Sequence, residues 1–372
     1  MPVLLKNLRL INFKNYTDQS VAFDEPFTAV VGPNGSGKTS LLEALHYLAL
    51  TKSLSGSGDA HNIKMGESFF TLFGQFESDG NLSEVQLSLE SAEGSLKKEL
   101  RMNGKECRRF ADHIGRFPLV SLIPKDIELI WESGEVRRKF FDQWMSQTER
   151  SYLEDLIKYQ HLLKNRNALL RAGRDGLSTD EELLRFYNAE MESPATRIHD
   201  FRKAFVDRIN PVVEVYYNKL VHPVTSEKIH VGYSSDLSER SIRQLLEESV
   251  IADQKAGRTT AGPHLDEYHF ELNGGEVRKY GSQGQQKSFL VALKLSMFHV
   301  LKEMTGINPI LILDDIFDKM DDSRIKNLLD IVCGSGFGQV ILTDSSPERA
   351  GRQLKPYAHS TITVDNGKIK NK

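Results

Sequence analysis

The chain has 372 residues, of which 39% are hydrophobic and 27% are charged. This length is too great for a disulfide-stapled peptide and provides for two or three domains, and the composition is neither collagen-like nor disordered. The 48 Lys and Arg residues nearly balance 51 Asp and Glu residues, which gives a net charge of −3. A polyanionic partner would therefore have to bind a local basic surface, because the molecule as a whole does not attract it.

The cysteines and the apolar segments restrict the class of protein further. Cys107 and Cys333 lie far apart and in no Cys/His cluster, which argues against a structural zinc site. No stretch reaches the ~18 apolar residues of a membrane-spanning helix, and the first residues lack the apolar stretch of a secretory signal. We therefore expect a cytoplasmic protein with no membrane segment.

The first 120 residues are predicted to be mixed in structure. Short alternating stretches in residues 4–27 and 69–101 predict half-buried, antiparallel strands. The continuous apolar run 27–31 predicts a central strand that is covered on both faces, and a helix is expected to begin at Ser40.

The sequence changes character after Pro124. Residues 137–220 are rich in Arg, Lys, Glu, Leu and Tyr, and three leucines are spaced by seven, which predicts a helical insertion: Leu156, Leu163 and Leu170. After breaks at Gly257 and beyond, we expect a helix at 286–305, a buried strand at 309–313, a helix at 322–333 and a last strand at 340–343. The predicted domains are a head formed by 1–120 and 258–372 and an inserted lobe formed by 121–257.

A phosphate-binding loop is the most specific motif. It fits the pattern G-x-x-x-x-G-K-[ST] between a predicted strand and a predicted helix, with residues Gly32, Pro33, Asn34, Gly35, Ser36, Gly37, Lys38 and Thr39. Its glycines let backbone N–H groups face phosphate oxygens, and the helix N-terminus adds partial positive charge. We expect Lys38 to contact the β- and γ-phosphates and the Thr39 hydroxyl to ligate Mg²⁺. A chance match would occur in about one such chain in a hundred.

Two adjacent carboxylates form the second candidate element. Asp314 and Asp315 end the aliphatic strand 309–313, which places them at the edge of a parallel sheet where ligands bind. We expect Asp314 to hold Mg²⁺ and Asp315 to polarise the attacking water. The alternative is that both are turn or helix-capping residues.

A polar loop that opens a predicted helix is the third element. It runs from Tyr280 to Ser288 and includes Ser282, Gly284 and Gln285. A helix N-terminus with a free hydroxyl can bind a second anionic group, and if it does not reach its own phosphate loop, it could contact the γ-phosphate held by a partner copy. Taken alone, the loop also fits a flexible Gly/Ser/Gln connection.

These three elements, in this order and separated by a helical insertion, resemble the SMC-like ABC-type ATPases, and within them the RecF family of bacterial recombination mediators. The stretches that carry the resemblance span nearly the whole chain: residues 8–16, 32–45, 137–142, 163–171, 262–264, 280–287 and 309–315. The resemblance implies an α/β fold, a P-loop ABC-type ATPase head whose mixed sheet has antiparallel border strands, with an inserted helical lobe.

The resemblance also implies a function. Members of this family are ATP-dependent DNA-binding proteins of recombinational repair, replication and the SOS response, which dimerise on ATP and act at single-strand gaps to help load recombinase with the RecO and RecR proteins. By position, Ser282, Gly284 and Gln285 would cap the γ-phosphate of a partner copy. Lys38, Asp315 and Ser282 would then form the catalytic set of a weak, DNA-stimulated ATPase that uses ATP and Mg²⁺.

The sequence departs from the family pattern at several positions. Leu265 stands where the family favours Arg, and residues 318–321 lack the usual Ser. Residues 124–126 contain no Gln, which SMC-like relatives often carry before the insertion. Thr343 falls where relatives carry a switch residue.

A basic stretch is the candidate DNA-binding surface. Between Arg137 and Arg174 there are nine Lys and Arg residues against four Asp and Glu residues. Such a face can track a phosphate backbone, and Arg166 and Arg171 are the expected contacts. Since no base-reading motif is evident, binding to single-stranded or gapped duplex DNA should not depend on base sequence. The alternative is a solvated helix face with surface ion pairs.

Three other functions stay open. The chain could be an ATP-gated DNA clamp with negligible hydrolysis. It could be the nucleotide-binding subunit of a membrane transporter, although the basic helical insertion disfavours this. A small-molecule kinase would leave the Ser282 loop and the Asp314–Asp315 pair unexplained.

Overall fold

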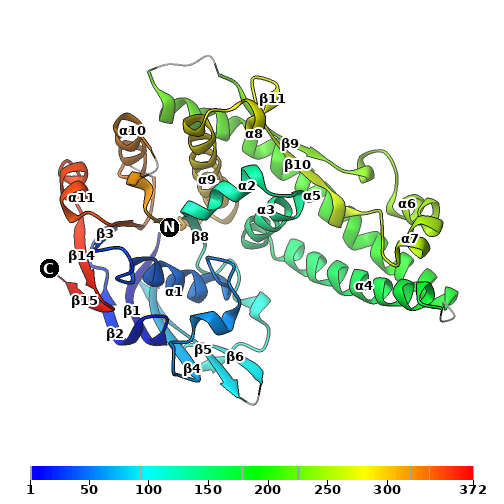
Figure 1. The fold of residues 1–372 in the computed structure, drawn as a ribbon, viewed down its shortest axis with the longest axis horizontal. Coiled ribbons are helices and arrows are strands. Elements are labelled where there is room, and N and C mark those ends of the chain that lie inside the picture. The colour runs from blue at the N-terminus through cyan, green and yellow to red at the C-terminus, as the bar shows by residue number, and fades with distance from the viewer. Residues whose placement is uncertain are drawn as a thin grey trace. The chain divides into compact units, whose positions relative to one another are not determined.

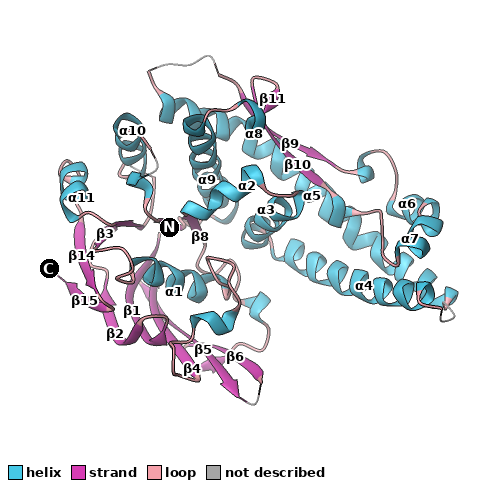
Figure 2. Ribbon diagram, in the orientation of Figure 1, coloured by secondary structure: helices cyan, strands magenta, loops and turns pink. Residues whose placement is uncertain are grey.

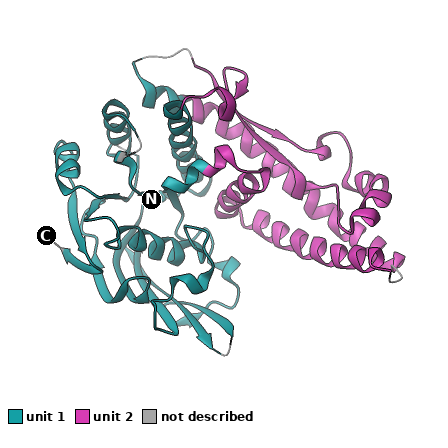
Figure 3. Cartoon of the chain, viewed as in Figure 1, with its two compact units in different colours: residues 1–127, 215–226, 283–372 teal, residues 128–214, 227–282 magenta. Residues whose placement is uncertain are grey.

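The computed structural model describes residues 2–92, 94–176, 180–223, 227–318, 320–334 and 336–371. The chain forms two compact units: unit 1 contains residues 1–127, 215–226 and 283–372, and unit 2 contains residues 128–214 and 227–282 (Figure 3). In the part of the chain that the structure describes, no helix combines the length and the apolar character needed to cross a bilayer.

These limits differ from the predicted domain boundaries at three places, of which the smallest is residues 121–127, which belong to unit 1. Residues 258–282 belong to unit 2, because β10 (Glu267–Leu272) pairs along its whole length with β9 (Ile229–Ser234). Residues 215–226 belong to unit 1, where Asn327 donates to the carbonyls of Leu220 and His222 at 3.0 and 3.2 Å. Pairings between segments distant in sequence, which composition does not reveal, thus decide where residues 215–226 and 258–282 belong.

Unit 1 contains a six-stranded sheet in the order β15-β14-β3-β13-β12-β8. Its strands are parallel except for the β14–β15 hairpin at one edge. The bounds are β3 Phe27–Val31, β8 Leu119–Leu122, β12 Ile310–Leu313, β13 Val340–Asp344, β14 Ser360–Asp365 and β15 Lys368–Asn371. Strands β3, β12 and β13 are buried along their whole length, as continuous apolar runs require in a parallel sheet covered on both faces.

A second sheet of unit 1 is antiparallel, in the order β2-β1-β4-β5-β6-β7. Its bounds are β1 Val3–Phe13, β2 Tyr16–Ala22, β4 Phe69–Ser78, β5 Asn81–Ala92, β6 Ser95–Met102 and β7 Lys105–Glu106. Buried and accessible residues alternate along β4 and β5, so one face of the sheet is in the core. The expected antiparallel border strands are therefore present (Figure 2).

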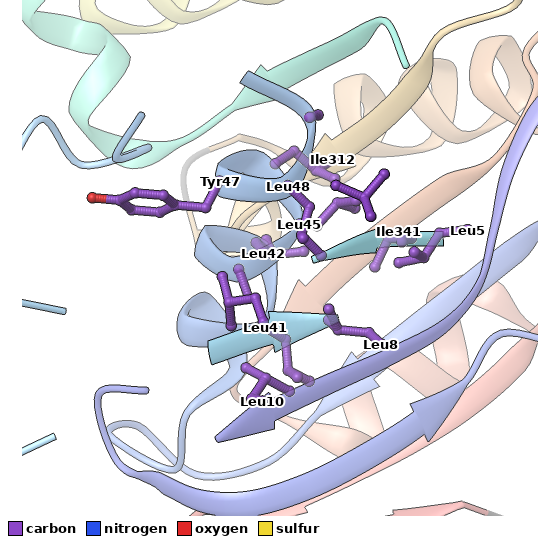
Figure 4. Close-up of a cluster of buried hydrophobic side chains, with 14 of the residues drawn as sticks. Leu5, Leu8, Leu10, Leu41, Leu42, Leu45, Tyr47, Leu48, Ile312 and Ile341 are labelled. Carbon is purple, nitrogen blue, oxygen red and sulfur yellow. The ribbon is translucent and has the colours of Figure 1, made fainter. Parts of the chain in front are cut away.

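Helix α1 (Lys38–Leu50) follows the phosphate loop and contacts both sheets. All of its residues from Leu41 to Leu50 are buried, as expected of a helix that is covered on every side. Figure 4 shows its leucines among side chains from β1, β12 and β13: Leu41, Leu42, Leu45 and Leu48 with Leu5, Leu8, Leu10, Ile312 and Ile341. This packing holds α1 against β1, β12 and β13.

The remaining helices of unit 1 include the two that were predicted at 286–305 and 322–333, whereas the helix that follows the last predicted strand was not predicted. They are α9 Gln283–Thr305, α10 Asp322–Val332 and α11 Pro347–Leu354, with the C-terminal part of α5 (Glu181–Val221) (Figure 1). Short 3-10 turns of this unit lie at Asp59–Asn62, Phe110–Asp112, Pro124–Ile127 and Ile316–Asp318.

Unit 2 is mostly helical. Its helices α4 (Arg150–Arg174) and α5 run antiparallel, as the ion pair of Asp155 with Arg197 and the hydrogen bond of Arg166 to Asn188 show. The other bounds are α2 Glu128–Trp131, α3 Gly134–Thr148, α6 Ile242–Glu248, α7 Val250–Ala256, α8 Val277–Tyr280 and β11 Gly275–Glu276, with 3-10 turns at Asp236–Ser238 and Pro263–Leu265. The small sheet β11-β10-β9 was not predicted, and it lies against α5 through hydrogen bonds between Asn210 and Val231.

Candidate nucleotide site

The phosphate loop connects β3 to α1, and close contacts require glycine at two of its positions, Gly32 and Gly37. A Cβ at Gly32 would lie 2.0 Å from the carbonyl oxygen of Val364. Gly37 has a φ of +118°, a conformation that L-residues rarely adopt, and a Cβ there would lie 2.7 Å from the Tyr16 hydroxyl. That hydroxyl donates to the Gly37 carbonyl at 3.0 Å, so the β2 strand holds the end of the loop.

The loop borders an open cavity of about 300 Å³, whose lining residues are Lys14, Asn15, Asn34, Gly35, Gly37, Lys38, Thr39, Ser40 and Asp315. Lys38 is buried, and its ammonium donates to the carbonyls of Gly32 and Pro33 at 2.8 and 3.0 Å. The first turn of α1 begins at this residue, so its N–H groups add partial positive charge. An anion of phosphate size therefore meets a cation, a helix terminus and a glycine-rich backbone at one place.

A buried polar atom in the loop also fits a ligand. Ser36 is only 2% exposed, and its Oγ has no hydrogen-bond partner among the described residues. A buried hydroxyl without a partner is costly, and an added acceptor such as a phosphate oxygen would satisfy it.

Asp314 directly follows β12, and its carboxylate accepts hydrogen bonds from two hydroxyl groups. Thr39 Oγ1 lies 3.1 Å from each of its carboxylate oxygens, and Thr343 Oγ1 donates to its Oδ1 at 2.7 Å. Burial raises the pKa of Asp314 above its ordinary value, and the hydrogen bonds from Thr343 and Thr39 act in the opposite direction. The structure thus brings the phosphate loop and the acidic pair together, as the sequence prediction requires.

Asp315 lines the cavity beside the loop. Its φ is +50°, and its backbone N–H donates to Thr343 Oγ1 at 3.0 Å. One threonine hydroxyl therefore contacts both members of the acidic pair. A hydroxyl and a carboxylate within hydrogen-bond distance are the oxygen ligands that Mg²⁺ accepts in nucleotide sites.

Comparisons with known proteins identify the family to which this site belongs. Residues 7–256 match the family model described as an AAA domain. The chain is 38% identical to the DNA replication and repair protein RecF of Flavobacterium johnsoniae, over 97% of this chain and 99% of that protein. The chain belongs to the RecF family. It is also 35% identical to RecF of Cytophaga hutchinsonii, over 98% of this chain and 96% of the relative.

Solved structures place the fold of this RecF-family chain among ABC-type ATPases. A structure of the recombination mediator protein RecF-ATP in the RecFOR pathway matches with a TM-score of 0.88 and 27% identity, and covers 100% of this chain and 98% of that one. The SMC head domain of Pyrococcus furiosus matches with a TM-score of 0.57 and 16% identity, over 99% of this chain and 95% of that one, which supports the fold alone. The predicted fold class is confirmed.

The Ser282 loop lies at the start of α9. Gly284 and Gln285 belong to its first turn, whereas Ser282 is the last residue of unit 2. A Cβ at Gly284 would lie 2.5 Å from a guanidinium nitrogen of Arg324 in α10, so a larger residue would displace that side chain. The contact of Ser282, Gly284 and Gln285 with a partner's nucleotide remains a prediction.

The two predicted DNA contacts in α4 have different environments. Arg166 is fully buried and pairs with Asp253 at 2.7 Å, and it also donates to Asn188 and Thr259 at 2.8 and 2.7 Å. The structure therefore gives Arg166 an internal role in unit 2 in place of the expected DNA contact. Arg171 is exposed, and its contact with DNA remains a proposal.

Positions that depart from the family pattern also have environments of their own. Asp126, in the segment without the Gln of SMC-like relatives, pairs with buried Lys294 of α9 at 2.7 Å. Leu265 is 43% exposed. Lys319, in the loop without the usual Ser, lies outside the described residues.

The sequence prediction missed Lys14 and Asn15, which line the cavity from the β1–β2 turn. The Asn15 amide donates to the Ser36 carbonyl at 2.8 Å. Lys14 lies 3.7 Å from Glu43, a fully buried carboxylate that also accepts from Ser53 Oγ at 2.6 Å. The available signal was the stretch 8–16, which carries the family resemblance, but only the pairing of β1 with β2 places Lys14 and Asn15 at the loop.

Proposed function

We propose that this chain is an ATP-dependent DNA-binding protein of recombinational DNA repair, replication and the SOS response. The observation that carries the proposal is the contact of Thr39 with Asp314 beside the phosphate loop, because this arrangement suits a magnesium nucleotide. The relatives named DNA replication and repair protein RecF, and the RecF-ATP structure, support the same function.

In this proposal the residues of the cavity have separate tasks. Lys38 leaves the loop carbonyls to contact the β- and γ-phosphates, and Lys14 is a second cation at the same cavity. Thr39 and Asp314 hold Mg²⁺, which neutralises charge on the phosphates. Asp315 orients the water that attacks the γ-phosphate. Hydrolysis is expected to be slow and stimulated by DNA.

ATP is proposed to join two copies of the chain. Lys38 of one copy and Ser282, Gly284 and Gln285 of the other would contact the same γ-phosphate. Changing the dimer population from 1:99 to 99:1 requires about 5.5 kcal/mol of preference. Two shared triphosphates, each with several charge-assisted hydrogen bonds of ~1.5–3 kcal/mol, suffice for this.

The proposed DNA partner is a single-stranded or gapped duplex that is bound without base specificity. Arg171 remains the candidate contact in α4. The RecO and RecR proteins are proposed as partners, which the relative of the RecFOR pathway supports. The proposed location is the cytoplasm.

The decisive experiment is sedimentation velocity of the full chain with magnesium and ATP, with ADP, and without nucleotide, each in the presence and absence of gapped duplex. We expect dimers with ATP alone or with ATP and DNA, and monomers with ADP. Ser282→Arg should stay monomeric, whereas Ser238→Arg, at an exposed position of unit 2, should behave as the wild type. A wild-type chain that stays monomeric under every condition would refute the proposal.

Single-turnover hydrolysis with and without gapped DNA separates the ATPase from the ATP-gated clamp. An ATPase converts bound ATP to ADP and phosphate, faster with DNA. A clamp dimerises and binds DNA while the bound ATP stays intact.

A further inference from the structure

Arg349 of α11 forms a two-point ion pair with Asp344 at the end of β13. Its Nε donates to Oδ2 of Asp344 at 3.1 Å, and its Nη2 contacts Oδ1 of the same carboxylate. The Asp344 side chain is fully buried, and that of Arg349 is 25% exposed. A guanidinium held by two parallel hydrogen bonds has a fixed plane and direction.

The same guanidinium lies over the ring of Phe317. The distance from Arg349 Cζ to the ring centroid is 5.9 Å, within the range of ~6 Å for a cation–π contact. Phe317 is buried, and only Ile316 separates it from Asp315. A residue of α11 thus contacts the segment that directly follows the acidic pair.

Asp315 lies in a turn of uncommon backbone conformation that is held on both sides. Its φ of +50° is a left-handed conformation, which few residues other than glycine, asparagine and aspartate adopt. On the amino side, its N–H is held by Thr343 Oγ1 at 3.0 Å. On the carboxyl side, Phe317 is held by Arg349. Thr343 and Asp344 are adjacent at the end of β13. Thr343 therefore holds the turn directly on one side, and Asp344 holds it on the other side through Arg349 and Phe317.

We propose that Arg349 is a positioning residue for ATP hydrolysis, which holds the turn of Asp315 through Phe317 while Asp344 orients its guanidinium. The inference rests on the proposed hydrolytic function and adds a residue outside the nucleotide cavity. Since Arg349 does not line that cavity, its substitution should change the rate of the chemical step more than the affinity for ATP.

A purely structural role for the pair makes a different prediction. Asp344 Oδ1 also accepts from the Ser346 N–H at 3.2 Å, so the ion pair anchors the first turn of α11. An anchor alone would affect thermal stability and leave hydrolysis at saturating ATP unchanged. Arg349→Lys separates the two roles, because it keeps a cation at Asp344 and removes the planar group over Phe317.

The test measures the single-turnover rate of hydrolysis and, by equilibrium dialysis, the dissociation constant for ATP in the full chain. Arg349→Lys and Phe317→Leu should each slow hydrolysis about tenfold or more and change the dissociation constant by less than about twofold. The double variant should be no slower than the slower single variant, because both act on one contact. Arg352→Gln, an exposed position on the same helix, is the matched control and should match the wild type.

Wild-type rates in Arg349→Lys and Phe317→Leu would overturn the inference, as would losses that multiply in the double variant. An equal rise in the dissociation constant would also overturn it, because Arg349 would then act on binding. If Arg349→Lys does not fold, Phe317→Leu alone decides, by the same criteria. A wild-type chain without any hydrolysis would overturn the proposed ATPase function as well, which distinguishes that failure from the failure of Arg349 alone.

Discussion

The Thr39 hydroxyl lies 3.1 Å from both carboxylate oxygens of Asp314, a residue 275 positions later in the chain. Thr39 is the last residue of the phosphate loop and lies in the first turn of α1, and Asp314 directly follows strand β12. The contact exists because β3 and β12 both pair with β13 as parallel strands, so that their carboxyl ends meet at one edge of the sheet.

Substitutions at this contact should alter the response to magnesium. We expect Asp314→Asn to raise the Mg²⁺ concentration needed for ATP binding by about tenfold or more, because a neutral amide replaces a carboxylate ligand. Thr39→Ser keeps the hydroxyl and should stay within about threefold of the wild type. Magnesium titrations followed with a fluorescent ATP analogue measure both. An unchanged titration in Asp314→Asn would contradict the assigned ligand.

Lys38→Arg should separate nucleotide binding from turnover. The variant keeps a positive charge but changes the donor geometry in a loop that holds the ammonium within 3.0 Å of two carbonyls. We expect partial retention of ATP binding and a loss of hydrolysis. Equilibrium dialysis and phosphate release measure the two properties, and wild-type hydrolysis would refute the role of Lys38.

Replacement by Ala should lower the free energy of unfolding strongly at Arg166 and hardly at all at Arg171. Arg166→Ala leaves the buried carboxylate of Asp253 without its cation, which is expected to lower the free energy of unfolding by about 3–5 kcal/mol. Arg171→Ala removes an exposed side chain and should stay within about 0.5 kcal/mol of the wild type. Urea denaturation at neutral pH is the measurement. Equal stability of the two variants would contradict the buried ion pair.

The Arg171→Ala variant also tests DNA binding. If Arg171 contacts a DNA phosphate, Arg171→Ala should weaken binding to gapped duplexes of different sequence to a similar extent and lower the salt dependence by about one ion. Fluorescence anisotropy at several salt concentrations gives this slope. An unchanged slope would remove Arg171 from the DNA-binding surface.

His46 is expected to make stability depend on pH. Burial in α1 lowers the pKa of His46 to about 4, and because the Lys52 carbonyl accepts from Nδ1 at 2.8 Å, the neutral ring carries its proton there. Its pKa in the unfolded chain is about 6.5, so between these values the unfolded chain binds more protons and the free energy of unfolding decreases as the pH falls.

The predicted loss from His46 between pH 7 and pH 5 is about 2 kcal/mol, because each pKa unit corresponds to about 1.4 kcal/mol. His46→Asn keeps a donor for the Lys52 carbonyl but does not titrate in this range. Urea denaturation at both pH values should therefore show a smaller pH effect in the variant than in the wild type. An identical pH effect would show that His46 does not have the lowered pKa.

Part of the site was predictable because its information is local. The phosphate loop is eight consecutive residues whose glycines and Lys38 are dictated by phosphate chemistry, and Asp314 and Asp315 follow an aliphatic strand that is recognisable by itself. The order of these elements also indicated the family and the fold class.

Only the tertiary structure determined which residues meet across long sequence distances. Arg166 looks like a surface cation in a basic helix, but its packing against Asp253 buries it completely. Lys14 has no motif of its own, and it reaches the cavity because the β1–β2 turn lies at the phosphate loop. Local patterns report the backbone conformation and the chemistry of neighbouring residues, whereas burial and ion pairing depend on contacts that form only when distant segments pack together.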